Sequence, residues 1–246
     1  MKIALSFVCP GYNEEKNLDT LIETIEYISK KLKVETELIY IDDNSSDNTR
    51  EILKNIKFKN LKYIKNKKNL GFGGSVAVGI KHAKGKKVMM IPSECDYTKN
   101  SLAAFAKAGF NNKAQIAVYK NSYLRHPLRR FITSSITKFT NFIFDLDIKI
   151  YTSLFIYDKK ILNNLNLKSK KFAFQMELIV KILKSKKVEK MEYKNIIINN
   201  SDGDFFTGAM KREAAIDLLK TYRELIRFKK KKLVFRNNHS DLISTS

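Results

Sequence analysis

The chain has 246 residues, of which 43% are hydrophobic, and this is enough apolar material for the core of one large α/β domain. That composition excludes intrinsic disorder as the main state of the chain. The 47 Lys and Arg outnumber the 25 Asp and Glu, and the net charge of +22 favours an anionic partner such as a nucleotide, an anionic lipid surface or nucleic acid.

The first 100 residues alternate apolar strands with amphipathic helices. We predict strands at 2–9, 37–42, 61–64 and 87–91, and helices at 18–32, in a short segment ending near 56, and at 71–83. This alternation predicts a mostly parallel sheet with helices on both faces. Ligands of such sheets bind at the carboxyl ends of the strands.

The regular alternation weakens after Pro92. We predict helices near 100–108, 128–144, 174–183 and 209–228, and strands near 115–119, 154–157 and 196–198. No internal repeat or obvious linker divides the chain, so we expect a single domain with a basic helical extension at its C-terminus.

The helix predicted at 128–144 carries aromatic side chains at helical spacing beside basic ones. Phe131, Phe139 and Phe142 recur along it with Arg130 and Lys138. The pattern fits a helix lying in the plane of a membrane, a helix that lines an acceptor site, or an ordinary core helix. Apolar surface on this helix and on the last helix would also suit a homodimer.

No targeting or membrane-spanning segment is apparent. The N-terminal apolar run meets polar residues too early for a signal peptide, and no stretch approaches the roughly 18–20 apolar residues that a spanning helix needs. Cys9 and Cys95 lie in separate segments without metal-ligand spacing, so we expect no disulfide. We therefore predict a cytoplasmic protein that can lie on the inner face of a membrane but not cross it.

Polar residues follow three of the predicted strands directly. They are the run 10–14 after the first strand, Asp42 and Asp43 at the end of the second, and Glu94 and Asp96 after the fourth. All three groups should meet at one edge of a parallel sheet. Carboxylates gathered there repel one another and lose water, so a bound ligand or cation explains them better than stability does.

These segments resemble the inverting glycosyltransferases of family 2, which have the GT-A fold. The resemblance rests on CPGYNEE, IDDNSSDNT, NLGFGGSVAVGIKHAKG and the acidic turn after the fourth strand, in that order over residues 1–100. FAFQMELIVKI at 172–182 is similar to a helix of the polyprenyl-phosphate branch of that family. The resemblance implies a nucleotide-sugar half at 1–99, an acceptor half at 100–205, and a C-terminal amphipathic helix with a basic tail at 206–246.

The resemblance also implies a donor site for a nucleoside-diphosphate sugar, with UDP or GDP as the nucleotide. Pro10, Tyr12 and Glu14 would border the nucleoside, while the Asp pair would reach the base or ribose. A turn rich in glycine would let the backbone approach the nucleotide. The nucleotide-binding residues implied are Pro10, Tyr12, Glu14, Asp42, Asp43, Asn69, Gly71 and Gly74.

The metal motif of the family is Asp-x-Asp, whereas this chain has Glu94-Cys95-Asp96. Glu94 and Asp96 are therefore the implied ligands of Mg²⁺ or Mn²⁺. The cation would neutralise charge on the departing nucleoside diphosphate, which gives Asp96 a catalytic role as well.

The nature of the acceptor stays open between a hydroxyl of a glycan and a lipid phosphate. A hydroxyl needs a carboxylate base, for which Glu177 is the candidate, whereas a phosphate needs cations around it instead. Arg129, Arg130 and Lys149 could supply those cations. Gln175, on the helix that resembles the branch, is the fourth acceptor-binding residue implied. After residue 145 the basic motifs usual in that branch are missing: the chain reads IKIYTSLFIY and NNSDGDFFTG.

We therefore predict an inverting, metal-assisted glycosyltransferase that acts in the assembly of cell-surface glycans or lipid-linked sugars. A family member that binds nucleotide but transfers sugar weakly is one alternative, and a membrane-binding module without catalysis is another. We expect no nucleic-acid partner, because nucleic-acid binding gives no reason for carboxylates at three strand ends.

Overall fold

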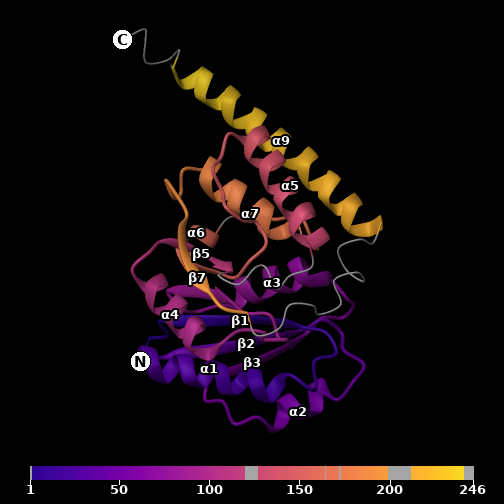
Figure 1. The fold of residues 1–246 in the computed structure, drawn as a ribbon, viewed down its shortest axis with the longest axis vertical. Helices are drawn as coiled ribbons and strands as arrows, with labels where there is room; N and C mark the ends of the chain where they lie inside the picture. Colours follow the sequence, from indigo (N-terminus) through magenta and orange to yellow (C-terminus); the bar gives the residue numbers. More distant parts are fainter. Residues whose placement is uncertain (1, 120–126, 164, 172, 199–211, 241–246) are drawn as a thin grey trace.

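The computed structural model describes residues 2–119, 127–163, 165–171, 173–198 and 212–240 (Figure 1). Its centre is one seven-stranded sheet with the order β3-β2-β1-β4-β6-β5-β7. The strands are β1 (Leu5–Gly11), β2 (Thr36–Asp42), β3 (Leu61–Lys65), β4 (Lys87–Met90), β5 (Ala114–Tyr119), β6 (Phe155–Asp158) and β7 (Glu192–Ile196). The helices are α1 (Leu18–Leu32), α2 (Thr49–Asn55), α3 (Gly71–His82), α4 (Lys99–Phe110), α5 (Pro127–Phe144), α6 (Lys159–Leu162), α7 (Ala173–Lys184) and α9 (Arg212–Ser240).

The first half of the sheet is parallel, as the sequence predicts. Strand β1 pairs in parallel with β2 and β4, and β2 pairs in parallel with β3. β1 and β2 are buried along their whole length because helices cover both faces. The single mixed α/β domain predicted from the pattern is therefore confirmed.

The second half of the sheet contains one reversed strand, β6. β6 pairs antiparallel with both β4 and β5, so β5 runs in the same direction as β4, and β7 pairs in parallel with β5. The carboxyl ends of β5 and β7 thus lie at the same edge of the sheet as those of β1, β2 and β4. The acceptor half predicted from the sequence joins the same sheet.

The last predicted strand is misplaced in the sequence analysis. The apolar run at 196–198 suggested a strand, but β7 occupies Glu192–Ile196, and Ile198 forms only an isolated bridge with Tyr97. β7 is an edge strand with partly exposed side chains, so it lacks the apolar run that marks a buried strand.

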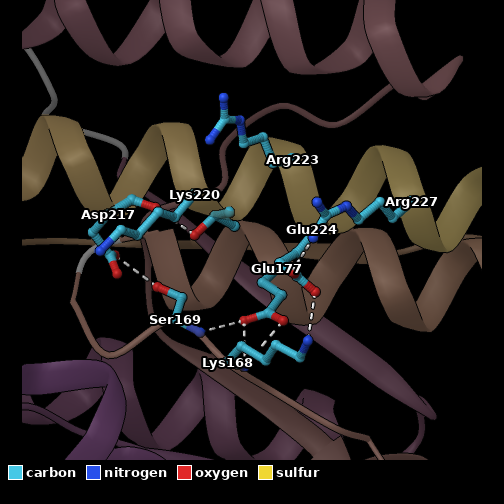
Figure 2. A pocket seen from close by; sticks show the side chains of 9 residues that line it. Lys168, Ser169, Glu177, Asp217, Lys220, Arg223, Glu224 and Arg227 are labelled. Atoms are coloured by element: carbon cyan, nitrogen blue, oxygen red, sulfur yellow. Dashed lines mark hydrogen bonds and ion pairs between the residues drawn. The ribbon is translucent and has the colours of Figure 1, made fainter.

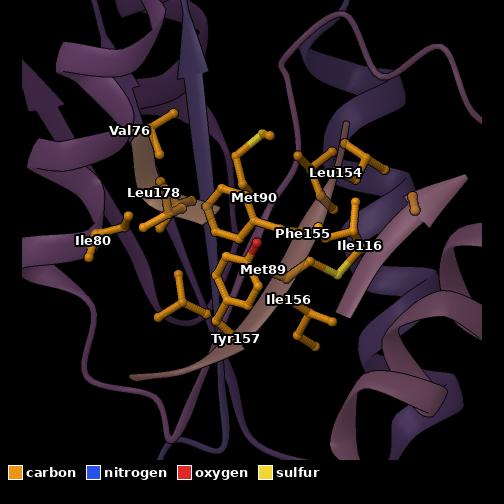
Figure 3. Close-up of a cluster of buried hydrophobic side chains, with 14 of the residues drawn as sticks. Val76, Ile80, Met89, Met90, Ile116, Leu154, Phe155, Ile156, Tyr157 and Leu178 are labelled. Carbon is orange, nitrogen blue, oxygen red and sulfur yellow. The ribbon is translucent and has the colours of Figure 1, made fainter. Parts of the chain in front are cut away.

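Helices α3 and α7 pack together against the middle of the sheet. Figure 3 shows Val76 and Ile80 of α3 and Leu178 of α7 gathered with side chains of β4, β5 and β6. Phe155 and Tyr157 stack with their ring centroids 4.7 Å apart. This packing fixes the strands whose ends carry the predicted site.

The C-terminal helix docks on the rest of the domain. Tyr222 and Leu225 of α9 are buried, and the Tyr222 hydroxyl lies 2.6 Å from the Thr140 hydroxyl of α5. Helix α9 continues to Ser240, well beyond the end predicted near 228, and its predicted start at 209 lies outside the described residues. In the part of the chain that the structure describes, no helix is both long and apolar enough to span a bilayer.

Candidate functional site

Four loops at the carboxyl ends of β1 to β4 contain a residue with left-handed backbone. These are Asn13 (φ 58°), Asn44 (φ 71°), Gly71 (φ 75°) and Cys95 (φ 48°). Glycine adopts this region freely and Asn tolerates it, but a Cys there is strained. Sharp turns therefore begin directly where the strands end and keep the polar side chains at one edge of the sheet.

The loops after β1 and β2 are joined into one unit by hydrogen bonds. The Asn13 N–H donates to Ser45 Oγ at 2.9 Å, and the Ser46 N–H donates to Asn13 Oδ1 at 2.9 Å. The Glu15 N–H donates to Asp47 Oδ2 at 3.1 Å. Of the predicted nucleotide residues here, Pro10 is buried, whereas Tyr12 is half exposed and open to a ligand.

Asp42 closes the turn that follows β2. Its Oδ1 accepts the Ser45 N–H at 2.6 Å, and its Oδ2 accepts the Tyr63 hydroxyl at 2.6 Å. The side chain is fully buried, so both oxygens are used within the protein. These contacts shape the loop, and a direct contact of Asp42 with nucleotide stays a prediction.

Asp43 holds the turn that precedes α3. One carboxylate oxygen accepts from the Leu70 N–H at 2.7 Å and from Asn66 Nδ2 at 2.8 Å, and the other accepts from the Gly71 N–H at 2.8 Å. Asn69 Oδ1 also accepts from the Gly71 N–H, at 3.1 Å. The structure therefore brings Asp43, Asn69 and Gly71 together, as the sequence predicts for a donor site.

Glu14, in the loop after β1, and Asp96, in the loop after β4, lie close enough for their like charges to interact. Burial raises the pKa of Glu14, and the nearby carboxylates of Asp47 and Asp96 raise it further against the opposing hydrogen bond from Asn17. Burial also raises the pKa of Asp96. Both shifts mean that the ionised carboxylates lack sufficient positive charge around them, which is the condition that a cation or a cationic complex would relieve.

The turn from Ser93 to Asp96 is anchored to β1. Ser93 Oγ donates to the Pro10 carbonyl at 2.7 Å, and Cys95 is buried, so Glu94 and Asp96 flank a fixed point. Burial raises the pKa of the Cys95 thiol to about 11, so the thiol stays protonated at neutral pH. Two hard carboxylate ligands fit Mg²⁺ or Mn²⁺, which take their remaining ligands from phosphates and water.

The described residues contain no group of three or more His, Cys, Asp or Glu side chains that could hold a metal ion. A cation at Glu94 and Asp96 would therefore need oxygens of a bound diphosphate to complete its ligands. This requirement suits a site where cation and nucleotide bind together.

Two tyrosines that were not predicted as site residues are linked near the acidic turn after β4, where Tyr97 interacts with Glu94. Tyr97 is hydrogen-bonded to Tyr119, the last residue of β5, and burial raises the Tyr97 pKa, with Tyr119 and Glu94 adding to the effect. No motif marks these tyrosines. The one available signal is the position of Tyr119 at the end of β5, because β5 ends at the same edge of the sheet as β1, β2 and β4.

Glu177 is placed away from the strand-end carboxylates, in a cluster between α7, α9 and segment 165–171. Its carboxylate accepts from the Lys168 N–H at 2.9 Å and the Ser169 N–H at 2.8 Å, and forms an ion pair with Lys181 at 2.5 Å. The side chain is fully buried, and every one of these partners lies within 168–181. These are the contacts of a positioning residue, and the catalytic role predicted for Glu177 stays a prediction.

A cavity of about 330 Å³ adjoins this cluster (Figure 2). Ser169 Oγ donates to Asp217 of α9 at 2.8 Å, and the Lys168 ammonium lies 2.6 Å from Glu224 of α9. The cavity is lined by Lys168, Ser169, Glu177, Asp217, Lys220, Thr221, Arg223, Glu224 and Arg227. Because the bonds of Asp217 with Ser169 and of Glu224 with Lys168 cross between the two, the cluster joins the C-terminal helix to the segment before α7.

That segment in turn supports the start of α3. The Lys170 carbonyl accepts the Gly74 N–H at 3.1 Å, and a Cβ on Gly71 would lie 2.8 Å from the same carbonyl oxygen. A Cβ on Gly73 would lie 2.5 Å from the Cβ of Phe174 on α7. The glycines therefore allow α7 and its preceding segment to pack directly behind the predicted nucleotide turn.

Contacts in the described part of the chain do not bring Arg130, Lys149 and Gln175 together, and the side chain of Arg129 lies outside the described residues. Gln175 is buried and exchanges hydrogen bonds with the backbone of Ser153. Lys149 is exposed, with its ammonium 5.0 Å from the centre of the Tyr193 ring. Arg129 and Arg130 lie near the start of α5, where Arg130 is exposed.

The chain is similar to known glycosyltransferases in sequence. The model of glycosyl transferase family 2 matches residues 6–165. A dolichyl-phosphate beta-glucosyltransferase of Trichomonas vaginalis is 28% identical over 149 residues, covering 53% of this chain and 44% of that protein. An undecaprenyl-phosphate 4-deoxy-4-formamido-L-arabinose transferase of Proteus mirabilis is 30% identical over 143 residues, covering 55% of this chain and 44% of that protein.

The chain thus spans less than half the length of these relatives. Among solved structures, glucosyl-3-phosphoglycerate synthase of Mycobacterium tuberculosis, in complex with Mn²⁺, UDP and glucosyl-3-phosphoglycerate, has a TM-score of 0.63 at 17% identity, covering 89% of this chain and 80% of that one. The same enzyme with Mg²⁺ and UDP has a TM-score of 0.65 at 16% identity, covering 89% of this chain and 79% of that one. At this identity the likeness concerns the fold.

Proposed function

Because the chain belongs to glycosyl transferase family 2 and has the GT-A fold, we propose that it transfers a sugar from a nucleoside-diphosphate donor to a lipid phosphate, with inversion at the anomeric carbon. The observation that carries the proposal is the convergence of Glu14, Asp43 and Asp96 at one edge of the sheet, where burial raises the pKa of Glu14 and Asp96. A divalent cation, bound there together with the diphosphate of the donor, would balance that charge.

The donor would lie over the loops after β1, β2 and β4. Asp43 holds the Asn69–Gly71 turn in place, so that the nucleotide would meet a fixed backbone, and the half-exposed Tyr12 would border the nucleoside. We propose UDP as the nucleotide, supported by the UDP bound in the structures of similar fold.

Glu94 and Asp96 would hold Mg²⁺ or Mn²⁺ together with the diphosphate. When bound there, such a cation supplies Lewis-acid stabilisation of the leaving nucleoside diphosphate. The chain's own contribution is to fix this turn through the bond between Ser93 and Pro10 and to bring Asp96 close to Glu14.

A lipid phosphate as acceptor is supported by the two relatives, which are named for dolichyl-phosphate and undecaprenyl-phosphate. An oxygen of the acceptor phosphate would form the new bond to the anomeric carbon, while the bond between that carbon and the nucleoside diphosphate breaks. An ionised phosphate needs no general base, which agrees with a Glu177 whose oxygens are already occupied. Arg129, Arg130 and Lys149 are the proposed cations around the acceptor, and assembly of cell-surface glycans at the inner face of the membrane belongs to the same proposal.

A transfer assay tests this function. The purified chain is incubated with UDP-[¹⁴C]glucose, undecaprenyl phosphate or dolichyl phosphate in detergent, and Mn²⁺, and label in the lipid extract is counted. We expect lipid labelling that EDTA abolishes and that Asp96→Asn lowers by about a hundredfold or more.

The matched control is Lys107→Glu, an exposed position on α4, which should transfer sugar at the rate of the unmodified chain. Parallel reactions with GDP-[¹⁴C]mannose test the choice of nucleotide. Nucleotide binding without label in any lipid, with either donor, would contradict transfer and favour a family member that only binds the donor.

A further inference from the structure

Helix α5 carries exposed aromatic side chains along one side. Phe131 is 70% exposed, Phe142 is 87% exposed and Phe139 is 55% exposed. At 3.6 residues per turn, these three positions fall within about a quarter of the helix circumference. The opposite side of α5 faces the core through Thr137, Thr140 and Phe144, which are buried.

The apolar surface continues from α5 onto α9. The ring of Tyr222 meets the ring of Phe139 edge-on, with centroids 5.5 Å apart. Leu219 and Ile226 lie one turn before and one turn after Tyr222 on α9, and they are 66% and 38% exposed. Figure 1 shows the two helices side by side at the end of the molecule opposite α1 and α2. We call this surface, made of Phe131, Phe139, Phe142, Leu219 and Ile226, the α5–α9 face.

Positive charge borders the α5–α9 face. Helix α5 contains no Asp or Glu, and residues 225–240 of α9 contain six Lys and Arg with no acidic residue. The described acidic side chains of α9, Asp217 and Glu224, lie instead in the cluster beside Glu177, where they contact Ser169 and Lys168. Exposed cations on the two helices are Arg130, Lys138, Lys220, Arg223 and Arg227.

Aromatic side chains framed by cations match the chemistry of an anionic bilayer surface. Exposed rings bury themselves at the level of the headgroups, while Lys and Arg approach the lipid phosphates. A second copy of the chain is a poorer match, because two such faces would bring like charges together. We propose that the α5–α9 face docks the protein on an anionic lipid membrane. The inference rests on the proposed function, because it names the surface that would meet the membrane holding the lipid acceptor.

Vesicle flotation tests the docking. The full chain is mixed with vesicles of phosphatidylcholine alone or with 30% phosphatidylglycerol, at low and high salt. We expect at least tenfold tighter binding to the anionic vesicles, weakened by salt. The double variant Phe131→Ser with Phe142→Ser should lower binding about tenfold, and Lys138→Glu with Arg223→Glu should lower it severalfold.

Matched controls lie away from this face. Ile197→Ser removes an apolar side chain that is 41% exposed elsewhere, and Lys57→Glu with Lys107→Glu makes the same change in net charge at other exposed positions. Both controls should bind vesicles within about twofold of the unmodified chain, and all variants should keep the same circular dichroism spectrum and melting temperature.

Three outcomes would overturn the proposal. The first is absence of binding to anionic vesicles by the unmodified chain. The second is equal loss of binding in the Lys57 and Lys107 control, which would mean that net charge alone drives the association. The third is a dimer in sedimentation analysis that Phe131→Ser with Phe142→Ser converts to monomer, which would make the face an interface between copies. A thermal melt of the same proteins with UDP tests the donor site separately. Failure of membrane docking can therefore be told apart from failure of the proposed reaction.

Discussion

Two groups of buried or half-buried carboxylates lie in this domain, and they differ in how they are compensated. Glu177 accepts two backbone N–H groups and an ammonium, and its partners all come from the neighbouring chain segment. Glu14 and Asp96 share a strand-end region in which their pKa values are raised by burial, and no described residue donates a hydrogen bond to or forms an ion pair with the Asp96 carboxylate.

This difference indicates a structural role for Glu177 and a ligand-binding role for Glu14 and Asp96. A buried carboxylate with its oxygens occupied stabilises the fold and has little capacity for a ligand. Carboxylates held near one another without cations destabilise the fold and are explained by what they bind. Sequence position alone did not distinguish the two groups, because a Glu on an apolar helix looks the same in either role.

The largest effect expected is at Glu177. Replacing it with Ala would leave Lys181 and two backbone N–H groups without their partner, so Glu177→Ala should lower the free energy of unfolding by about 3–5 kcal/mol in urea titrations. Glu224→Ala, which removes two partly exposed ion pairs of the same cluster, with Lys168 and Arg227, should have a far smaller effect. A Glu177→Gln variant with unchanged stability but no transfer would instead restore the predicted role as a base.

The next effect is at Asp43. In Asp43→Asn an amide NH₂ would replace one of the oxygens that accept from Asn66, Leu70 and Gly71, so we expect a loss of about 1–3 kcal/mol in unfolding free energy. The loosened turn should also weaken binding of UDP in calorimetric titrations. Asp19→Asn, an exposed position on α1, serves as the control and should change neither quantity. Unchanged stability and unchanged UDP affinity in Asp43→Asn would contradict the role given to this turn.

The smallest effect is a gain in stability at Asp96. A carboxyl whose pKa is raised by folding destabilises the native state above its folded pKa, and this penalty disappears as the pH falls through that value. Asp96→Asn should therefore melt at a higher temperature than the unmodified chain at pH 7, and the difference should vanish toward pH 4. Scanning calorimetry across this range measures it, and a variant that is less stable at pH 7 would show that Asp96 has a compensating partner.

The sequence predicted the donor half of the fold well. Apolar runs bounded by polar loops located β1 to β4, because strands buried on both faces need such runs. The same signal failed at β7, whose partly exposed edge position does not require one. The end of α9 was missed because its Lys-rich last turns lack an apolar stripe, although the helix continues to Ser240.

Some features of the candidate site could also be predicted from the sequence, and others could not. Parallel strands that end at one edge of the sheet predict that the loops after β1, β2 and β4 meet. The place of Asn69 and Gly71 beside Asp43 was implied by the family resemblance. The pairing of Tyr97 with Tyr119, and the saturation of Glu177 by the backbone of Lys168 and Ser169, depend on contacts between distant segments. Such contacts leave no motif in the sequence.

The most direct test of this account is a thermal melt with UDP, with and without Mn²⁺, on the unmodified chain, Asp96→Asn and Glu177→Gln. A ligand that binds only the native state at a hundred times its Kd adds about 2.7 kcal/mol of stability. We predict a Mn²⁺-dependent rise in melting temperature that Asp96→Asn loses and that Glu177→Gln retains from a lower starting temperature. The account would be contradicted if UDP stabilised none of the proteins, or if Asp96→Asn kept the shift while Glu177→Gln lost it.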